Sequence, residues 1–187
     1  ALEFLATVFE IQEGIADRLL PLKDSNLLDE TEILGYLMTI LSDKSMYTKR
    51  PSLLSKTLQI LTHLFEAAPG YHDVSLKIQG LPDFWKKIIQ CIIINDQDIN
   101  DQTLLLQIKQ AKSTLDNNKG KHTSAKYDEI RYKYYRLLQR YKNLQIQRLQ
   151  VKTWAIQIIT IELYRNKNNI ELIKVLKEIP LSIHQLW

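Results

Sequence analysis

The chain of 187 residues has few of the residues that make tight turns. It contains five glycines and five prolines. Together these are about 5% of the chain, against roughly 12% in an average protein. No Asn-Gly or Asp-Gly pair occurs, although such pairs form the commonest tight hairpins. Because a β-sandwich or a β-barrel needs many such turns, we predict an all-α fold.

Cysteine is also nearly absent, since Cys91 is the only one. A single thiol cannot form an internal disulfide or a thiolate metal site. Cys91 lies in the apolar run Ile88–Ile94, so we expect a buried core side chain. We expect no membrane span, because no run approaches ~18 apolar residues. We expect no signal peptide, because the N-terminal Ala-Leu-Glu-Phe is amphipathic and acidic. The first residue is not methionine, and we expect a segment cut from a larger protein of a reducing compartment.

The net charge of +4 hides an asymmetry between the two parts of the chain. Residues 1–100 carry 9 Lys and Arg against 14 Asp and Glu, a net charge of −5. Residues 101–187 carry 16 against 7, a net charge of +9. The two parts are therefore expected to present different electrostatic faces to a partner.

Apolar residues at spacings of three and four predict most of the helices. The predicted helices cover residues 1–12, 15–22, 29–41, 51–67, 72–78, 83–94, 103–115 and 170–177. Pro51 suits a first helical position, and Asn169 can cap the last helix. Residues 127–167 contain no Gly or Pro, so they form either one long helix or two. Residues 95–102 and 116–126 are predicted to be polar loops.

The most informative pattern is an internal repeat, in which residues 2–20 align with residues 58–76. Seven positions are identical at an offset of 56: Leu2/Leu58, Leu5/Leu61, Phe9/Phe65, Glu10/Glu66, Gly14/Gly70, Asp17/Asp73 and Leu20/Leu76. The unit is a helix with a wide apolar face, a glycine turn and a short second helix. One such unit cannot bury its apolar face alone, whereas stacked units can. A chance similarity between two amphipathic helices is the alternative.

We interpret this repeat as part of an α-solenoid. Its core residues are Leu2, Leu5, Phe9, Leu58, Leu61 and Phe65, and its turns are at Gly14 and Gly70. The whole chain, 1–187, is expected to be one solenoid segment. Within it, 1–94 is an acidic repeat half, 95–126 holds polar loops around helix 103–115, and 127–187 is a basic helical half.

Patterns for catalysis and for metal binding are weak. His63 lies three residues before Glu66, which could make an acid–base or metal pair, but a half-exposed histidine beside an exposed glutamate is the simpler interpretation. Residues 96–101 resemble the start of a calcium loop. A calcium loop needs Gly at the position of Asp101 and Glu at the position of Gln107, so we reject calcium binding by this segment. We expect the acidic residues of the segment to cap the next helix instead. Gly120-Lys121-His122 lacks the remaining residues of a phosphate loop. We expect no enzyme activity, no cofactor, no metal and no small-molecule substrate.

A basic, tyrosine-rich segment carries the best candidate for a binding surface. Residues 119–152 hold ten Lys and Arg and two acids, with five tyrosines among them. Ile130, Tyr134, Leu137, Tyr141 and Leu144 follow spacings of four and three, which predicts a core stripe with cations on the outer face. Three interpretations stay open: a solvated helix face, a contact surface for an acidic protein, or nucleic-acid binding without specific base reading. The candidate contact residues are Arg131, Lys133, Arg136, Arg140, Lys142 and Arg148.

Two stretches resemble a known family. They are residues 2–20, with Leu2-Glu-Phe-Leu-Ala-Thr-Val-Phe-Glu and Gly14-Ile-Ala-Asp-Arg-Leu-Leu20, and Gly80-Leu-Pro-Asp-Phe-Trp-Lys-Lys-Ile88. Both are similar to stretches of the large α-solenoid scaffold nucleoporins of the nuclear pore inner ring. The resemblance covers about half of the chain. The offset of 56 exceeds the ~40–47 residues of HEAT repeats, which an extra helix near residues 29–41 would explain.

The resemblance implies a right-handed, karyopherin-like superhelix of HEAT/armadillo-like repeats at the nuclear envelope. Its function would be that of a structural scaffold in protein and mRNA transport. It would hold helical segments of linker nucleoporins and would have no enzyme activity. Two alternatives are a nucleic-acid-binding module that uses helix 127–152 and a karyopherin-type transport receptor or adaptor.

Overall fold

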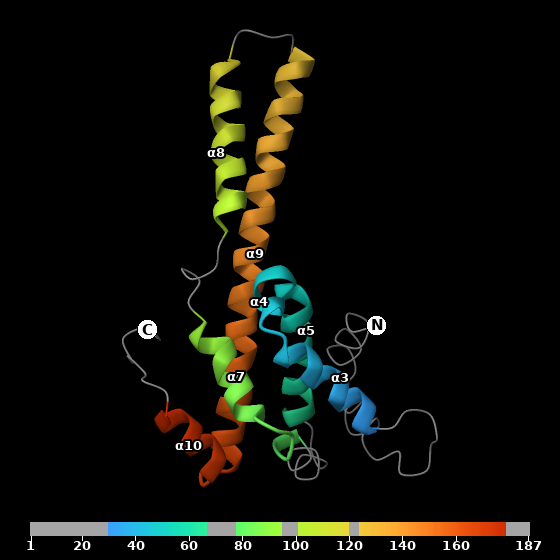
Figure 1. Ribbon diagram of the computed structural model, residues 1–187, viewed down its shortest axis with the longest axis vertical. Coiled ribbons are helices and arrows are strands. Elements are labelled where there is room, and N and C mark those ends of the chain that lie inside the picture. Colours follow the sequence, from blue (N-terminus) through green and yellow to red (C-terminus); the bar gives the residue numbers. More distant parts are fainter. Residues whose placement is uncertain (1–29, 67–77, 95–100, 120–123, 179–187) are drawn as a thin grey trace. The chain divides into compact units, whose positions relative to one another are not determined.

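The computed structural model describes residues 30–66, 78–94, 101–119 and 124–178 (Figure 1). These residues form helices and no strand, which confirms the predicted all-α class. The helices are α3 (Glu30–Ser42), α4 (Ser45–Lys49), α5 (Pro51–Glu66), α7 (Phe84–Ile93), α8 (Gln102–Asn117), α9 (Ser124–Arg165) and α10 (Ile170–Glu178). The helices predicted within residues 1–22 lie outside the described residues, as do Leu2, Leu5, Phe9, Gly14 and Gly70.

The chain divides into two compact units. The first is made of residues 1–94 and 150–187, and the second of residues 95–149. Helix α9 belongs to both units, since its 42 residues run without a break from Ser124 to Arg165. The sequence left open whether residues 127–167 form one helix or two, and the structure shows one.

Helix α5 is the most deeply buried helix among those described in the first unit. Leu58, Leu61 and Phe65 lie in the core, as predicted for the second copy of the repeat. Polar residues beside them are buried too, including Thr57 and Thr62. The hydroxyls of these threonines donate to carbonyl oxygens one turn earlier, so their burial leaves no polar group unsatisfied. A helix of this kind must have neighbours on several sides.

Those neighbours come from both near and distant parts of the chain. Helices α3 and α4 pack on α5, and α3 and α10 also pack on α7. Helix α9 reaches α5 through Arg165, whose guanidinium donates to the carbonyl oxygens of Phe65 and Glu66 at 2.8 and 3.1 Å. These carbonyls end a helix and have no intrahelical partner, so a cation at this position satisfies them. The wide apolar face of α5 is therefore buried against several helices.

An aromatic cluster joins α5 to α7. The rings of Phe65 and Phe84 are stacked with centroids 5.8 Å apart. Trp85 meets both rings edge-on, at 6.0 and 5.0 Å. All three side chains are fully buried. The residue before the cluster, Asp83, has a left-handed backbone with φ of 57°, which lets the chain turn sharply into α7.

Two helix starts depend on a side chain close by. Asn169 caps α10, as predicted, because its side-chain oxygen accepts the amide hydrogen of Leu172 at 3.0 Å. Helix α4 was not predicted. Its start is fixed by the carboxylate of Asp43, which accepts the amide hydrogen of Ser45 at 2.8 Å. That hydrogen bond lowers the pKa of Asp43.

The second unit contains a pair of adjacent helices, α8 and the first part of α9 (Figure 1). Leu138, Gln145 and Gln147 of α9 are half-buried beside the main series. The main sets of less exposed residues are Leu104, Ile108, Ala111 and Leu115 in α8, and Tyr127, Ile130, Tyr134, Leu137, Tyr141, Leu144 and Arg148 in α9. Both sets follow alternating spacings of three and four, which is the pattern of helices packed side by side as in a coiled coil. The five residues of the predicted core stripe therefore lie on the less exposed side of α9, where each is half-buried, and Tyr127 and Arg148 extend the series.

The loop predicted over residues 116–126 is wrong at both ends. Helix α8 continues to Asn117, and α9 begins at Ser124. Polar residues mark loops only weakly, because a helix with one buried stripe can be polar on its other sides. In the same way α8 begins one residue earlier than predicted, at Gln102.

Candidate functional site

The described residues hold no cluster suited to metal chemistry. No group of three or more His, Cys, Asp and Glu side chains comes together in the part of the chain that the structure describes. His63 and Glu66 do meet, with 3.5 Å between Nδ1 and Oε2. The imidazole is partly buried and lies 6.1 Å from the ring of Trp154, measured between centroids. The pair therefore matches the simpler interpretation of a half-exposed histidine beside an exposed glutamate.

Cys91 lies on the buried side of α7, as predicted. Burial raises the pKa of its thiol to about 12, because a thiolate would lose its hydration there. Nucleophilic cysteines have the opposite property, namely a lowered pKa and access to solvent. Cys91 is therefore a packing residue.

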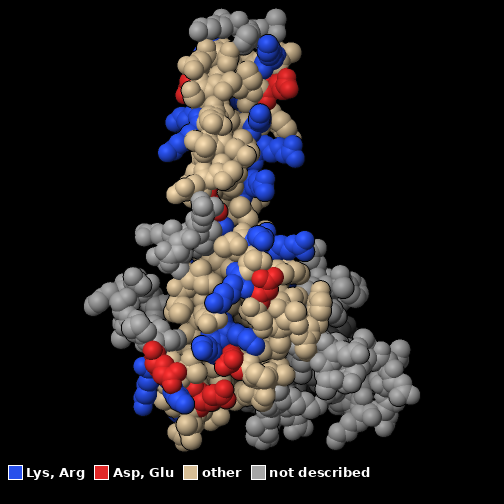
Figure 2. All heavy atoms as spheres, viewed as in Figure 1, with Lys and Arg blue, Asp and Glu red and all other residues tan. Residues whose placement is uncertain are grey.

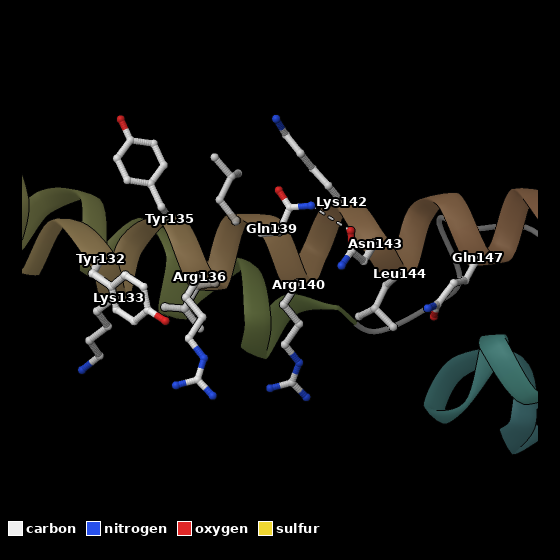
Figure 3. Close-up of a pocket in the computed structure, with 12 residues that line it drawn as sticks. Tyr132, Lys133, Tyr135, Arg136, Gln139, Arg140, Lys142, Asn143, Leu144 and Gln147 are labelled. Atoms are coloured by element: carbon white, nitrogen blue, oxygen red, sulfur yellow. Dashed lines mark hydrogen bonds between the residues drawn. The ribbon is translucent and has the colours of Figure 1, made fainter. Parts of the chain in front are cut away.

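A hollow of about 980 Å³ lies along α9 in the second unit (Figure 3). All twelve residues that line it come from α9, between Tyr132 and Gln147. One helix can provide only one wall, so this is an open surface between long side chains. Such a surface does not enclose a small molecule, but it can be covered by another macromolecule.

A row of three cations, Lys133, Arg136 and Arg140, runs along this surface. The side chains point to the same side of the helix (Figure 3). They are spaced by three and four residues, exposed, and without an ion pair to any described residue. We call them the cation row. Residues 130–161 include no Asp or Glu but seven Lys and Arg, so α9 itself offers the row no anion.

The remaining predicted contact residues divide into two groups. Arg131 and Lys142 are exposed on α9, although Arg131 lies 3.9 Å from the carboxylate of Asp128. Figure 2 shows Lys and Arg side chains along α8 and α9, with fewer acidic ones among them. Over the described residues of this unit, ten Lys and Arg stand against four Asp and Glu. This surface can therefore attract an anionic partner over a distance of about 8 to 10 Å.

Arg148 does not belong to this surface, which corrects the prediction for that residue. Only 1% of its side chain is exposed, and its guanidinium donates two hydrogen bonds to the carboxylate of Asp101. Asp101 precedes the first residue of α8 but does not cap it through its side chain. The two residues fix the start of α8 against α9. The position of Arg148 in the core stripe was the signal for its burial, since it follows Leu144 by four residues.

Four exposed apolar side chains form a second row on α9. Tyr132 and Tyr135 are 70% and 56% exposed, and Ile146 and Leu149 are 55% and 65% exposed. The second pair follows the first by fourteen residues, which is two heptads. We call these four residues the outer apolar row. It lies roughly 150° around α9 from the core stripe, as calculated for 3.5 residues per turn. This row is not among the predicted contact residues, although the same heptad spacing is visible in the sequence.

Comparison of the chain with protein-family models, with curated protein sequences and with solved structures finds no significant match. Among the described residues, no helix is both long and apolar enough to span a bilayer.

Proposed function

We propose that the chain is a non-enzymatic helical scaffold that binds other proteins. The observation that supports this best is the exposed cation row beside the outer apolar row on one open helix surface. Charge attracts and orients a partner, and exposed apolar side chains provide the area that is buried on binding. Neither feature is needed for the fold, because the core stripe of α9 faces elsewhere.

We also propose the nuclear pore as the setting, with the chain as one segment of an α-solenoid. The resemblance of residues 2–20 and 80–88 supports this setting. Support for stacked repeats comes from the burial of α5 on several sides, because an inner helix of a solenoid needs neighbours in that way. The partners would be helical segments of other pore proteins.

Binding of native partners tests the first proposal. The tagged chain is incubated with nuclear-envelope extract, and retained proteins are quantified for the wild type and for the Arg136→Glu, Arg140→Glu double variant. We expect specific proteins to be retained and to fall by about tenfold in the variant, since two interface charges are reversed. The matched control is Lys109→Glu, Lys112→Glu, which changes the same charge on exposed residues of α8. Equal loss in both variants would contradict a specific surface.

Location in the cell tests the setting. A fluorescent fusion of the chain, expressed in cells, is expected to concentrate at the nuclear rim. Proximity labelling from the same fusion should then mark pore subunits. A signal spread evenly through the cytoplasm, with no pore subunit labelled, would contradict the setting and leave protein binding to be judged by the capture experiment.

Nucleic-acid binding is the second candidate function, because Tyr132 and Tyr135 are exposed among cations and aromatic rings can stack on bases. Its test is a salt titration with a single-stranded RNA oligomer. Micromolar affinity at ~150 mM salt that is lost in the Arg136→Glu, Arg140→Glu, Lys142→Glu variant would support it. No binding at that salt would exclude it.

A further inference from the structure

We propose that the outer surface of α9 binds an acidic amphipathic α-helix of about 20 residues, laid along the outer apolar row with its acidic side chains toward the cation row. This inference rests on the proposed function, because it names the kind of protein that the scaffold would hold. It assigns the binding to one face of α9 in the second unit, and it predicts that the partner is an acidic amphipathic helix.

The spacing of the outer apolar row indicates that the partner is a helix. Tyr132 and Tyr135 are three residues apart, as are Ile146 and Leu149, and the two pairs are in the same heptad register. At 1.5 Å per residue the row is about 26 Å long. A helix packed side by side contacts its neighbour at intervals of three and four residues, so one helix can reach both pairs. Binding of an extended peptide or of a globular surface would not require apolar side chains at this heptad spacing.

The charge of the surface indicates that the partner is acidic. Counted along the helix, the cation row lies next to the outer apolar row, and Lys142 shares the heptad position of Tyr135 and Leu149. In Figure 3 the ring of Tyr132 extends to the side of the cation row, whereas Tyr135 and Lys142 extend to the opposite side. Residues 130–147 include no carboxylate to balance these cations. A partner with Glu or Asp beside its apolar stripe would supply these charges. A basic or neutral helix would gain nothing from them.

The same charges argue against a symmetric dimer in which this surface meets its own copy. Two copies of the surface would bring like charges together, which destabilises an interface. Ile146 and Leu149 argue against a nucleic acid as the occupant of the whole surface, because they have no ring to stack on a base and no charge to meet a phosphate. Half of the outer apolar row would then remain exposed.

The test uses the full 187-residue chain and a synthetic, fluorescein-labelled peptide of 21 residues. The peptide has Leu at the a and d positions of three heptads and Glu beside them. Fluorescence anisotropy is expected to give a Kd of roughly 1 to 100 μM, which is typical of a small, transient interface. A peptide of the same composition in scrambled order should bind at least about tenfold more weakly, and so should a version with Lys in place of Glu.

Variants of the chain locate the binding. The Ile146→Gln, Leu149→Gln double variant is expected to weaken binding about tenfold or more. The matched control is Leu105→Gln, Leu106→Gln, which makes the same exchange at exposed leucines of α8 and should leave binding unchanged. Circular dichroism checks that both variants keep the helix content of the wild type, since all four residues are exposed.

Several outcomes would overturn the inference. They are equal binding of the scrambled peptide, equal loss in both double variants, or tighter binding of a 15-nucleotide RNA or of anionic lipid vesicles. A dimer in solution that dissociates in the Ile146→Gln, Leu149→Gln variant would also overturn it. Failure of this inference is separable from failure of the proposed function. Capture of native partners without peptide binding contradicts only the inference, whereas peptide binding without any captured partner contradicts only the proposed function.

Discussion

Arg148 and Asp101 lie 47 residues apart in the chain and form one bidentate ion pair. The two terminal nitrogens of the guanidinium donate to the two carboxylate oxygens at 2.6 and 3.0 Å. Two parallel bonds of this kind fix the direction of both groups as well as their distance. The pair therefore sets the register between the start of α8 and the middle of α9.

Breaking this pair is expected to destabilise the second unit. Asp101→Ala leaves the buried guanidinium of Arg148 without its carboxylate, which should lower the free energy of unfolding by about 3 kcal/mol. Arg148→Met should be milder, because an unbranched apolar side chain can fill the same space. Hydrogen exchange of the α8 amides measures both changes. The control is Asp116→Ala, which removes only the exposed pair with Lys119 and should change little; a larger loss there would contradict the assignment.

A second prediction concerns Glu162, which is fully buried where α9 ends. Its carboxylate accepts hydrogen bonds from the side-chain amides of Asn169 and Asn166, at 2.7 and 3.2 Å. The amide of Asn169 also donates to Gln79 at 2.8 Å. Glu162→Ala should lower the free energy of unfolding by about 2 to 3 kcal/mol, because buried donors lose their acceptor.

Glu162→Gln should cost less than Glu162→Ala, since the amide of glutamine keeps one acceptor oxygen in the same place. Urea unfolding followed by tryptophan fluorescence measures both variants, because Trp85 and Trp154 belong to the first unit. An alanine variant as stable as the glutamine variant would show that the hydrogen bonds contribute nothing to stability.

A third prediction is a stabilising substitution at Gly35, which lies in the interior of α3. A methyl group added at this position meets no other atom within 4 Å. Gly35→Ala should therefore raise the free energy of unfolding by up to about 1 kcal/mol, because alanine restricts the unfolded chain and favours the helix. The melting temperature should rise. A lower melting temperature would mean that α3 is not helical at this residue.

A fourth prediction concerns the thiol of Cys91, whose pKa is raised by burial to about 12. The native chain at pH 8 should react very slowly with a thiol reagent, and the chain in 8 M urea should react at once. Stability should also fall between about pH 9 and pH 12. In that range the unfolded thiol has lost its proton while the folded one keeps it, so rising pH favours unfolding.

The matched control for the pH effect is Cys91→Ala. This variant is less stable because of its smaller side chain, but the part of the pH dependence that comes from Cys91 should disappear. An unchanged slope of stability against pH would assign the effect to other groups. Fast labelling of the native wild type would contradict the burial itself.

The helices were the most predictable part of the fold, because their signals are local. Pro51 and Asn169 stand at helix starts, and the core stripe from Ile130 to Leu144 follows its spacing in the structure. Helix α4 has only five residues, too few for a periodic pattern. Its start depends on one hydrogen bond from the Ser45 amide to Asp43, which no spacing shows.

The contacts between distant residues could not be predicted in the same way. Composition predicts Arg148 to be a surface cation because arginine is rarely buried, whereas its burial depends on Asp101, which precedes another helix. Glu162, Asn169 and Gln79 meet only when α9 turns back into α10. The cations of α9 were recognised from composition, but the outer apolar row was not, since its four members are separated by up to eleven residues.

The heptad spacing of α9 has a consequence for how this protein can change over time. The core stripe, the cation row and the outer apolar row all share one helix, so their angular positions depend on residue count. One inserted or deleted residue near position 140 would rotate everything beyond it by about 100° relative to what comes before. Substitutions alter one row at a time, whereas an insertion or deletion would misalign all three. Between residues 130 and 149, we therefore expect a change of length to be tolerated less well than a change of amino-acid identity.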